Sequence, residues 1–408
     1  MTSDALSAAL SAAPAPTGTD SGWFDRRRVI LWGSVLLVLQ AGFLVFLAAW
    51  QHGFVTGTAA KTSSDFVSFY AAGKLALAGT PVLAYDQVAH AAMEHAVRGP
   101  DGPYQFFFYP PVYLLLCSAF AWLPYYLAYA LFEVLGLVPL ILVMRAIMRQ
   151  SGWGWLGPLF AFPAVWWTIG LGQNAFLTAA LLGGFTLLLD RRSASAGILV
   201  GLLCYKPHFG LLAPVALLAG RQWRAFFAAG ATVAGLVSLS VLLFGAETWR
   251  GYLEAFAGSQ SVYGTGRIDY AGIVTPFGAA RLLGVPAGVA NAIQGVVALA
   301  LAGLVGFFWF HRRGTEAARA ALLLSATLLA VPLALVYDQM IALVAIGWLV
   351  RAGRDGGFLP GEKASIAVLY PLAIITWPVG SAWDIPLGPV VGLVVLVLSL
   401  RRLLLPAV

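Results

Sequence analysis

Three arginines, Arg26-Arg27-Arg28, are followed at residues 29–50 by the run VILWGSVLLVLQAGFLVFLAAW. The run contains no charged residue, and a helix of about 20 such residues spans the hydrocarbon core of a bilayer. Similar apolar runs recur to the end of the chain, which is 60% hydrophobic and only 10% charged. Because soluble domains carry about 25% charged residues, the sequence predicts an all-α polytopic membrane protein.

The apolar runs predict about twelve transmembrane helices. We place them at residues 29–50, 126–144, 153–170, 174–189, 194–205, 209–220, 225–244, 286–310, 316–331, 339–350, 364–380 and 387–400. The runs 194–205 and 209–220 are too short to cross alone, and we expect a hairpin of half-helices that meet at Lys206-Pro207. The run 109–123 opens with Pro110-Pro111 and predicts an external re-entrant or interfacial helix.

Arginines at the ends of these runs predict the orientation of the chain. If successive spans cross the membrane in alternating directions, these arginines all lie on one side, which the positive-inside bias assigns to the cytoplasm. They are Arg145, Arg149, Arg191, Arg192, Arg221, Arg224, Arg312, Arg313, Arg351, Arg354, Arg401 and Arg402. Residues 1–28 are then a disordered cytoplasmic tail, and residues 29–408 are one transmembrane domain whose C-terminus is also cytoplasmic. The large external loops are 51–124, expected to be catalytic, and 245–283.

The run 29–50 is too long for a signal peptide and lacks a convincing cleavage site.

Several other classes of site are disfavoured. The net charge of +7 comes from basic residues in twos and threes at helix ends, so the chain has no basic patch that indicates nucleic acid. Cys117 and Cys204 lie in apolar runs without the spacing of a disulfide or a metal site. His90 and His95 are poorly spaced for two ligands on one helix face. We therefore expect no metal and no cofactor.

Two charged residues are the strongest candidates for chemistry. Asp65 follows Thr62-Ser63-Ser64 and precedes an amphipathic stretch, so it is either the N-cap of a helix or a general base at the membrane surface. Lys206 interrupts an otherwise apolar run, where a charge is expensive and by default functional. It either snorkels to the membrane interface or binds a phosphate, with His208 as a second polar group beside it.

Other polar residues are expected on the same external side. The sequence Gly172-Gln173-Asn174 stands between two predicted spans, where it forms either a capped turn or a pair of amides for sugar hydroxyls. Asp338 begins a later span at the same level. Arg267 either pairs with Asp269 or contributes to phosphate binding.

These residues together carry a resemblance to a known family. The segment DFVSFYAAGKL at residues 65–75, with Asp65 and Tyr70, and the later pair Tyr85-Asp86 resemble the opening motif of glycosyltransferase family 87. Tyr109-Pro110-Pro111, Gly172-Gln173-Asn174 and Lys206-Pro207 follow in the family's order, and the likeness extends over about residues 32–350. One departure is the run Val331-Pro332-Leu333, where many members have a histidine after the proline.

The resemblance implies a GT-C-type fold in a bacterial inner membrane, with external amphipathic or re-entrant helices. It also implies a polyprenyl-phosphate sugar as donor, mannose being the first candidate among hexoses and pentoses, and a glycolipid or glycan as acceptor. Asp65 would be the single catalytic base of an inverting transfer on the periplasmic or extracellular face. Lys206 and Arg267 would stabilise the phosphate, and the other named residues would bind substrate.

Two other classes of function fit part of the sequence. A transporter or lipid flippase also uses short broken helices around a membrane-level lysine. The absence of a visible repeat and the large external loop disfavour it. A non-catalytic scaffold would explain neither Lys206 nor the acidic residues of the external loops.

Overall fold

The computed structural model describes residues 26–51, 65–99, 103–150, 152–264 and 269–405. This part of the chain is helical, and its only strand-like feature is an isolated bridge between Ile273 and Leu335. The predicted all-α class is confirmed. Most of the tail predicted at 1–28 lies outside the described residues, as does Arg267. Residues 26–28 form the first turn of a helix instead of ending a tail.

The helices follow in one order along the chain. The α-helices are α2 (Arg26–Gln51), α3 (Phe66–Leu77), α4 (Gln87–Arg98), α5 (Val112–Ala121), α6 (Tyr125–Met148), α7 (Leu156–Phe160), α8 (Pro163–Leu171), α9 (Ala175–Leu188), α10 (Ser193–Gly201), α11 (Ala213–Ala219), α12 (Trp223–Phe244), α13 (Ala246–Gly264), α14 (Pro276–Leu282), α15 (Ala287–Phe310), α16 (Glu316–Ala330), α17 (Met340–Gly356), α18 (Glu362–Trp383) and α19 (Val390–Leu404). Short 3-10 helices are η1 (Pro81–Tyr85), η2 (Leu202–Tyr205), η3 (Pro207–Gly210), η4 (Tyr270–Gly272) and η5 (Val336–Gln339).

Five helices of the described chain are long and apolar enough to cross a membrane. They are Tyr125–Met148, Trp223–Phe244, Ala287–Phe310, Val336–Gly356 and Glu362–Trp383. The count of about twelve spans stays a prediction. The single helix predicted at 153–170 is wrong, because the chain there forms α7 and α8 with a break between them. Pro163 begins α8, and a proline, which lacks the N–H of a continuing helix, fits the first turn of a new one.

Burial separates a central helix from lipid-facing ones. The segment Val336–Gly356 is almost entirely buried, and its α17 packs against α16, α9, α6 and α19. A helix that is apolar all round belongs in such a core. On α12 hardly any residue is buried, and Leu242 and Leu243 are 82% and 62% exposed. A long apolar helix with bare leucines is typical of a surface that lipid covers.

The hairpin predicted around Lys206-Pro207 is present. One arm is α10 continued by η2, the other is η3 continued by α11, and Lys206 stands between them. The bases of the arms meet, since Ser193 Oγ donates to Oε1 of Gln222 at 3.4 Å. The first arm packs closely on α12, where a Cβ on Gly197 would lie 2.2 Å from the carbonyl oxygen of Ala225. Only glycine allows this approach, as in small-residue contacts between membrane helices.

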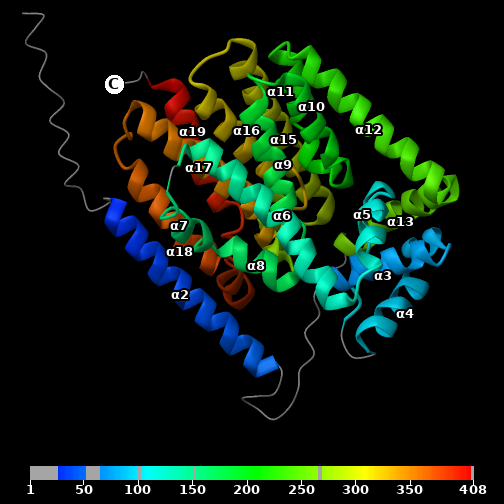
Figure 1. Ribbon diagram of the computed structural model, residues 1–408. Coiled ribbons are helices and arrows are strands. Elements are labelled where there is room, and N and C mark those ends of the chain that lie inside the picture. Colours follow the sequence, from blue (N-terminus) through cyan, green and yellow to red (C-terminus); the bar gives the residue numbers. More distant parts are fainter. Residues whose placement is uncertain (1–25, 52–64, 100–102, 151, 265–268, 406–408) are drawn as a thin grey trace, which may run out of the picture.

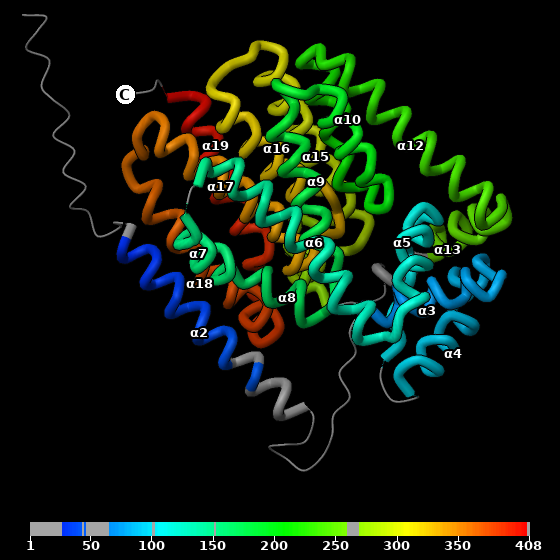
Figure 2. Tube along the Cα trace, viewed as in Figure 1, coloured from blue at the N-terminus to red at the C-terminus, as the bar shows by residue number. Residues whose placement is uncertain are grey.

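Four helices gather at one end of the bundle. Figure 1 shows α3, α4, α5 and α13 together at the lower right. A helix is present within the predicted range 109–123, namely α5, which begins after Pro110-Pro111 and packs on α3, while its external re-entrant or interfacial position stays a prediction. The start of α2 and the end of α19 lie toward the opposite end, as the trace in Figure 2 shows. The bundle therefore has two distinct ends, one with α3, α4, α5 and α13 and one with the arginine-rich helix ends.

The two ends can be assigned to the two sides of the membrane by cysteine labelling. In a background with Cys117 and Cys204 replaced by alanine, we expect Gly258→Cys to react with an impermeant thiol reagent in intact cells. Ala194→Cys, at the base of the hairpin, should react only after the membrane is permeabilised, because the positive-inside bias places the arginine-rich end in the cytoplasm. The reverse pattern would invert the orientation.

Candidate functional site

Asp65 lies just before α3, and its carboxylate contacts the loop after α8. Its Oδ2 accepts a hydrogen bond of 2.7 Å from Nε2 of Gln173, and its backbone N–H donates to the carbonyl of Leu171 at 2.7 Å. Its side chain accepts no capping hydrogen bond from α3. Asp65 therefore stands at the N-cap position of α3 without capping the helix through its side chain.

The surroundings of Asp65 shift its protonation. Burial raises the pKa of the carboxyl above its ordinary value, because a poorly solvated site disfavours the charged form. The hydrogen bond from Gln173 and the positive charge of Lys206 oppose this shift. The carboxyl is thus moved toward the range in which it can accept a proton, while two groups favour its charged form.

A tight turn between α8 and α9 presents Gln173. Gly172 has φ +67°, the left-handed conformation that glycine adopts most readily after a helix. The backbone N–H of Gln173 closes the turn on the carbonyl of Thr168 at 3.0 Å. The amide of Gln173 is held at both ends, since Nε2 donates to Asp65 and Oε1 accepts from the hydroxyl of Tyr109 at 3.5 Å.

Asn174 extends the polar cluster. It stands at the N-cap of α9 but its side chain makes no capping bond. Its Nδ2 donates to the hydroxyl of Tyr113 at 3.0 Å, and its buried Oδ1 has no hydrogen-bond partner among the described residues. Tyr113 stacks between Tyr109 and Tyr205, with ring centroids 4.5 and 5.2 Å away. The amides of the turn thus face a wall of aromatic rings, as sugar-binding sites do.

Lys206 forms a buried ion pair. Its Nζ donates to Oδ1 of Asp338 at 3.0 Å, and the two residues are only 4% and 3% exposed. Oδ2 of Asp338 accepts from the backbone N–H of Leu335 at 3.0 Å. The ammonium also lies over the rings of Phe209 and Tyr337, 5.5 and 5.3 Å from their centroids. The snorkelling interpretation is wrong, because the side chain is enclosed in protein.

The structure brings six of the predicted site residues into one linked cluster. They are Asp65, Tyr109, Gln173, Asn174, Lys206 and Asp338. The first four are joined by hydrogen bonds or stacked rings, and Lys206 is close enough to Asp65 to affect its pKa. They come from five separate parts of the chain, so the cluster exists only in the folded protein.

Two predicted tyrosines support the cluster from behind. The hydroxyl of Tyr85 donates to the backbone carbonyl of Tyr109 at 2.9 Å, and that of Tyr70 donates to the carbonyl of Leu123 at 2.7 Å. Both side chains are buried. These contacts hold the backbone on either side of α5, and a role of either tyrosine in substrate binding stays a prediction.

The remaining predicted residues contact other groups. Asp86 is exposed, and its carboxylate caps α4 by accepting from two backbone N–H groups. The ring of His208 packs on Phe209 with centroids 4.4 Å apart. Arg267 lies outside the described residues. Asp269, its expected partner, accepts from Trp377 and Ser381.

One acidic residue of the site was not predicted. Glu133 on α6 is 9% exposed, and neither carboxylate oxygen has a hydrogen-bond partner in the described part of the chain. With Gln173 and Asn174 it lines a cavity of about 10 Å³, which has room for about one water molecule. The signal was present in the sequence, since Glu133 is the only charged residue of the run 126–144 and such residues are functional by default.

Metal ligation has little support in the described residues, which contain no group of three or more His, Cys, Asp or Glu side chains placed for one ion. His90 is buried, and its Nε2 lies 3.1 Å from the carbonyl of Ser68. The absence of a metal and of a cofactor stays a prediction.

Comparison with known proteins gives one match. The family model of glycosyltransferase family 87 matches residues 107–335, more than half of the 408 residues. The matched part contains Tyr109, Gln173, Asn174 and Lys206, whereas Asp65 lies before it. No curated protein and no solved structure matches the chain significantly.

The Lys206–Asp338 pair predicts a large energetic coupling. Lys206→Met and Asp338→Leu should each lower the free energy of unfolding by about 3–5 kcal/mol, because each leaves a buried charge unpaired. The double variant should recover most of the loss. The measurement is chemical unfolding of the detergent-purified variants.

The exposed pair Arg250–Glu247, with side chains 68% and 72% exposed, is the matched control. Its two single variants and their double should differ from the wild type by at most about 1 kcal/mol. Additive losses in Lys206→Met and Asp338→Leu would show that the buried pair is not coupled.

Proposed function

This chain belongs to glycosyltransferase family 87, and we propose that it transfers a sugar from a polyprenyl-phosphate donor to a glycolipid or glycan acceptor. Mannose is the sugar that we propose first, on the resemblance to polyprenol-phosphate-mannose enzymes. We further propose that it works in a bacterial inner membrane, with both termini in the cytoplasm and the site on the periplasmic or extracellular face. The long apolar helices support the membrane setting.

The observation that carries the proposal is the hydrogen bond of 2.7 Å that fixes Asp65 on Gln173. A general base must be held in place, have a lone pair available and have a pKa closer to neutrality than an ordinary carboxyl. Gln173 occupies Oδ2 of Asp65, and no donor among the described residues reaches Oδ1. Burial raises the pKa of the group. Asp65 therefore has the properties of a base, which none of the other predicted site residues combines.

The proposed reaction needs one such base. Oδ1 of Asp65 takes the proton of an acceptor hydroxyl while the hydroxyl oxygen attacks the anomeric carbon. The bond from that carbon to the phosphate oxygen breaks, and the electron pair leaves with the polyprenyl phosphate. Attack from the face opposite to the leaving group inverts the anomeric centre. A phosphate is already a stable anion, so the second, acidic carboxyl of a glycosidase is not required.

Lys206 is suited to the leaving phosphate. An ammonium has three N–H donors, and Asp338 takes one of them. The negative charge that grows on the phosphate oxygen is stabilised most by a cation already held in a site without water. Lys206 lies at the tip of a hairpin among the helices, and a phosphate carried on a prenyl chain can reach such a depth from the bilayer.

A transporter or flippase would share the broken hairpin but would not need a base. The decisive assay incubates the purified protein with radiolabelled polyprenyl-phosphate sugars and a membrane lipid extract. Transfer of label to an acceptor supports the enzyme. Movement of the intact donor between leaflets of a vesicle, with no transfer, would support the rival function.

Asp65→Asn should leave a folded protein whose rate of sugar transfer falls by about 10²–10⁴-fold, because the amide cannot accept the proton. Donor binding should survive, since Lys206 is unchanged. The measurement is transfer by detergent-purified protein that elutes as a single species. Asp384→Asn is the control, because it makes the same chemical change at an exposed residue and should keep the wild-type rate. Wild-type transfer by Asp65→Asn would exclude this residue as the base.

The fall of the transfer rate at acid pH should reflect protonation of the Asp65 carboxyl. The base works only when deprotonated, so the rate should fall as the pH falls through a pKa above the ordinary value of about 3.9. Gln173→Met removes the hydrogen bond that lowers this pKa, and we expect its acid limb to shift to higher pH. Gln87→Met, at an exposed position, should leave the profile unchanged. If the acid limb of Gln173→Met stayed at the wild-type pH, the group that titrates would not be one to which Gln173 is hydrogen-bonded.

A further inference from the structure

A second polar cavity lies at the other end of α9 from the candidate site. Its volume is about 340 Å³, and it is lined by Thr186, Leu189, Asp190, Gly220, Gln222, Trp309, Arg312, Glu316, Arg319 and Ala320. The helix between the two places has 14 residues, which is about 21 Å at 1.5 Å per residue. None of the lining residues belongs to the candidate site. The cavity therefore requires a separate explanation.

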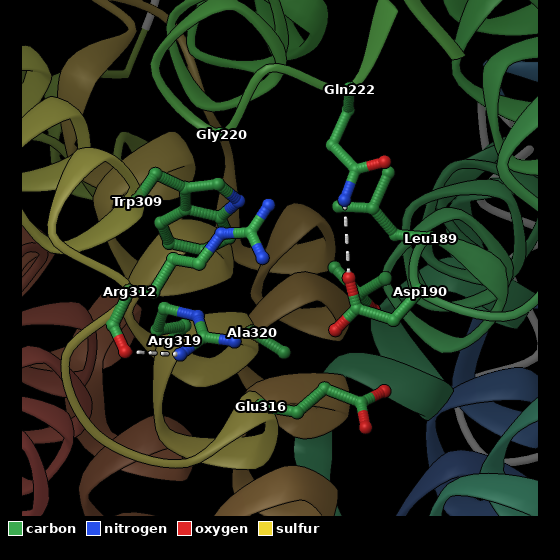
Figure 3. Close-up of a pocket in the computed structure, with 10 residues that line it drawn as sticks. Leu189, Asp190, Gly220, Gln222, Trp309, Arg312, Glu316, Arg319 and Ala320 are labelled. Carbon is green, nitrogen blue, oxygen red and sulfur yellow. Dashed lines mark hydrogen bonds between the residues drawn. The ribbon is translucent and has the colours of Figure 1, made fainter. Parts of the chain in front are cut away.

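The charges of this cavity are arranged in two groups. In Figure 3, Arg312 and Arg319 reach in from one side, and Asp190 and Glu316 stand opposite. No ion pair in the described part of the chain joins either arginine to either carboxylate. Oε1 of Glu316 is buried without a hydrogen-bond partner among the described residues. Nη1 of Arg319 donates to the backbone carbonyls of Arg312 and Gly314 at 3.2 and 2.8 Å, which holds its guanidinium at the wall of the cavity. Two positive and two negative side chains thus line the cavity with no ion pair between them among the described residues.

This pattern selects a ligand with both charges. Guanidinium groups bind phosphate oxygens in pairs of hydrogen bonds, and carboxylates accept hydrogen bonds from an ammonium. A phosphate monoester alone would be repelled by Asp190 and Glu316. We propose that the cavity binds a phosphoethanolamine head, which is a phosphodiester that carries a primary ammonium, with the phosphate on Arg312 and Arg319 and the ammonium on the two carboxylates.

The position of the cavity favours a phospholipid as the source of this head. It is formed by the ends of α9, α11 and α15 and the beginnings of α12 and α16, where apolar helices meet polar loops. Trp309 closes one wall, and tryptophan is enriched at the surface of membranes. The water-soluble glycerol ester of the same head offers identical charges, so an experiment must separate the two sources.

A bound head would also hold the base of the hairpin. Nε2 of Gln222 donates to Oδ1 of Asp190 at 3.3 Å, and Oε1 of Gln222 accepts from Ser193 at 3.4 Å. These residues join the two arms whose tip carries Lys206. The headgroup therefore contacts the element that presents the ammonium of the candidate site.

The test measures lipid binding to the delipidated protein by native mass spectrometry. The probes are phosphatidylethanolamine, phosphatidylglycerol and phosphatidylcholine with the same acyl chains. We expect phosphatidylethanolamine to bind about tenfold (about 1.4 kcal/mol) more tightly than the other two, because only its primary ammonium can donate hydrogen bonds to the two carboxylates. Arg312→Gln should bind all three lipids more weakly, because it removes one of the two guanidinium groups proposed to hold the phosphate that they share. Its control is Arg313→Gln, since Arg313 lies over the ring of Phe307 and does not line the cavity.

A second variant tests the ammonium subsite. Glu316→Gln leaves the cavity with net positive charge, so its preference should move from phosphatidylethanolamine to the anionic phosphatidylglycerol. Equal binding of the three lipids by the wild type, wild-type affinity in Arg312→Gln or wild-type selectivity in Glu316→Gln would overturn the proposal. Displacement of the lipid by glycerophosphoethanolamine at equal concentration would identify the soluble ester as the ligand, and retention would identify the lipid. Asp65→Asn should bind lipid normally, so this test is independent of the proposed transferase activity.

Discussion

The ion pair between Lys206 and Asp338 is the interaction on which the arrangement of the site depends. It joins the tip of the hairpin to the start of the buried segment Val336–Gly356, 132 residues later in the chain. A single charge at that depth would be strongly unfavourable, so each partner requires the other. The pair therefore fixes a cation among apolar helices, where its electrostatic effect is strongest, and Asp65 lies within reach of that effect.

Opposing influences act on the protonation of Asp65, the residue that we propose as the base. Burial disfavours its charged form, while the amide of Gln173 and the charge of Lys206 favour it. A carboxylate that is stabilised too well does not accept a proton, and one that is stabilised too little is already protonated. The turn at Gly172 matters because it aims the amide at the carboxylate, and the tyrosine wall holds the other end of that amide.

Several features of the fold were predictable, because the cost of placing polar residues in lipid limits which residues a spanning helix can contain. The all-α class and the helix that follows Pro110-Pro111 came from apolar periodicity and proline chemistry. The broken hairpin came from a lysine and a proline placed between two runs too short to span. The helix predicted at 153–170 was wrong because hydropathy records apolarity and not backbone continuity, and the break before Pro163 lies within an apolar run.

The sequence by itself determined that this protein occupies a membrane and which few polar residues stand in apolar surroundings, because the cost of burying charge in lipid is the same in any fold. It left open whether Asp65 is a helix cap or a base, and whether Lys206 snorkels or binds a phosphate. Only the tertiary structure showed that the side chain of Asp65 bonds to Gln173 and that Lys206 is enclosed in protein, and it placed Glu133 beside Gln173, since hydrogen-bond partners from distant segments meet only after the helices pack. The opposed charges around Asp190 and Arg312 could not be recognised from the sequence either. In the sequence they are ordinary charged residues at helix ends, and only packing of the helices encloses a cavity between them.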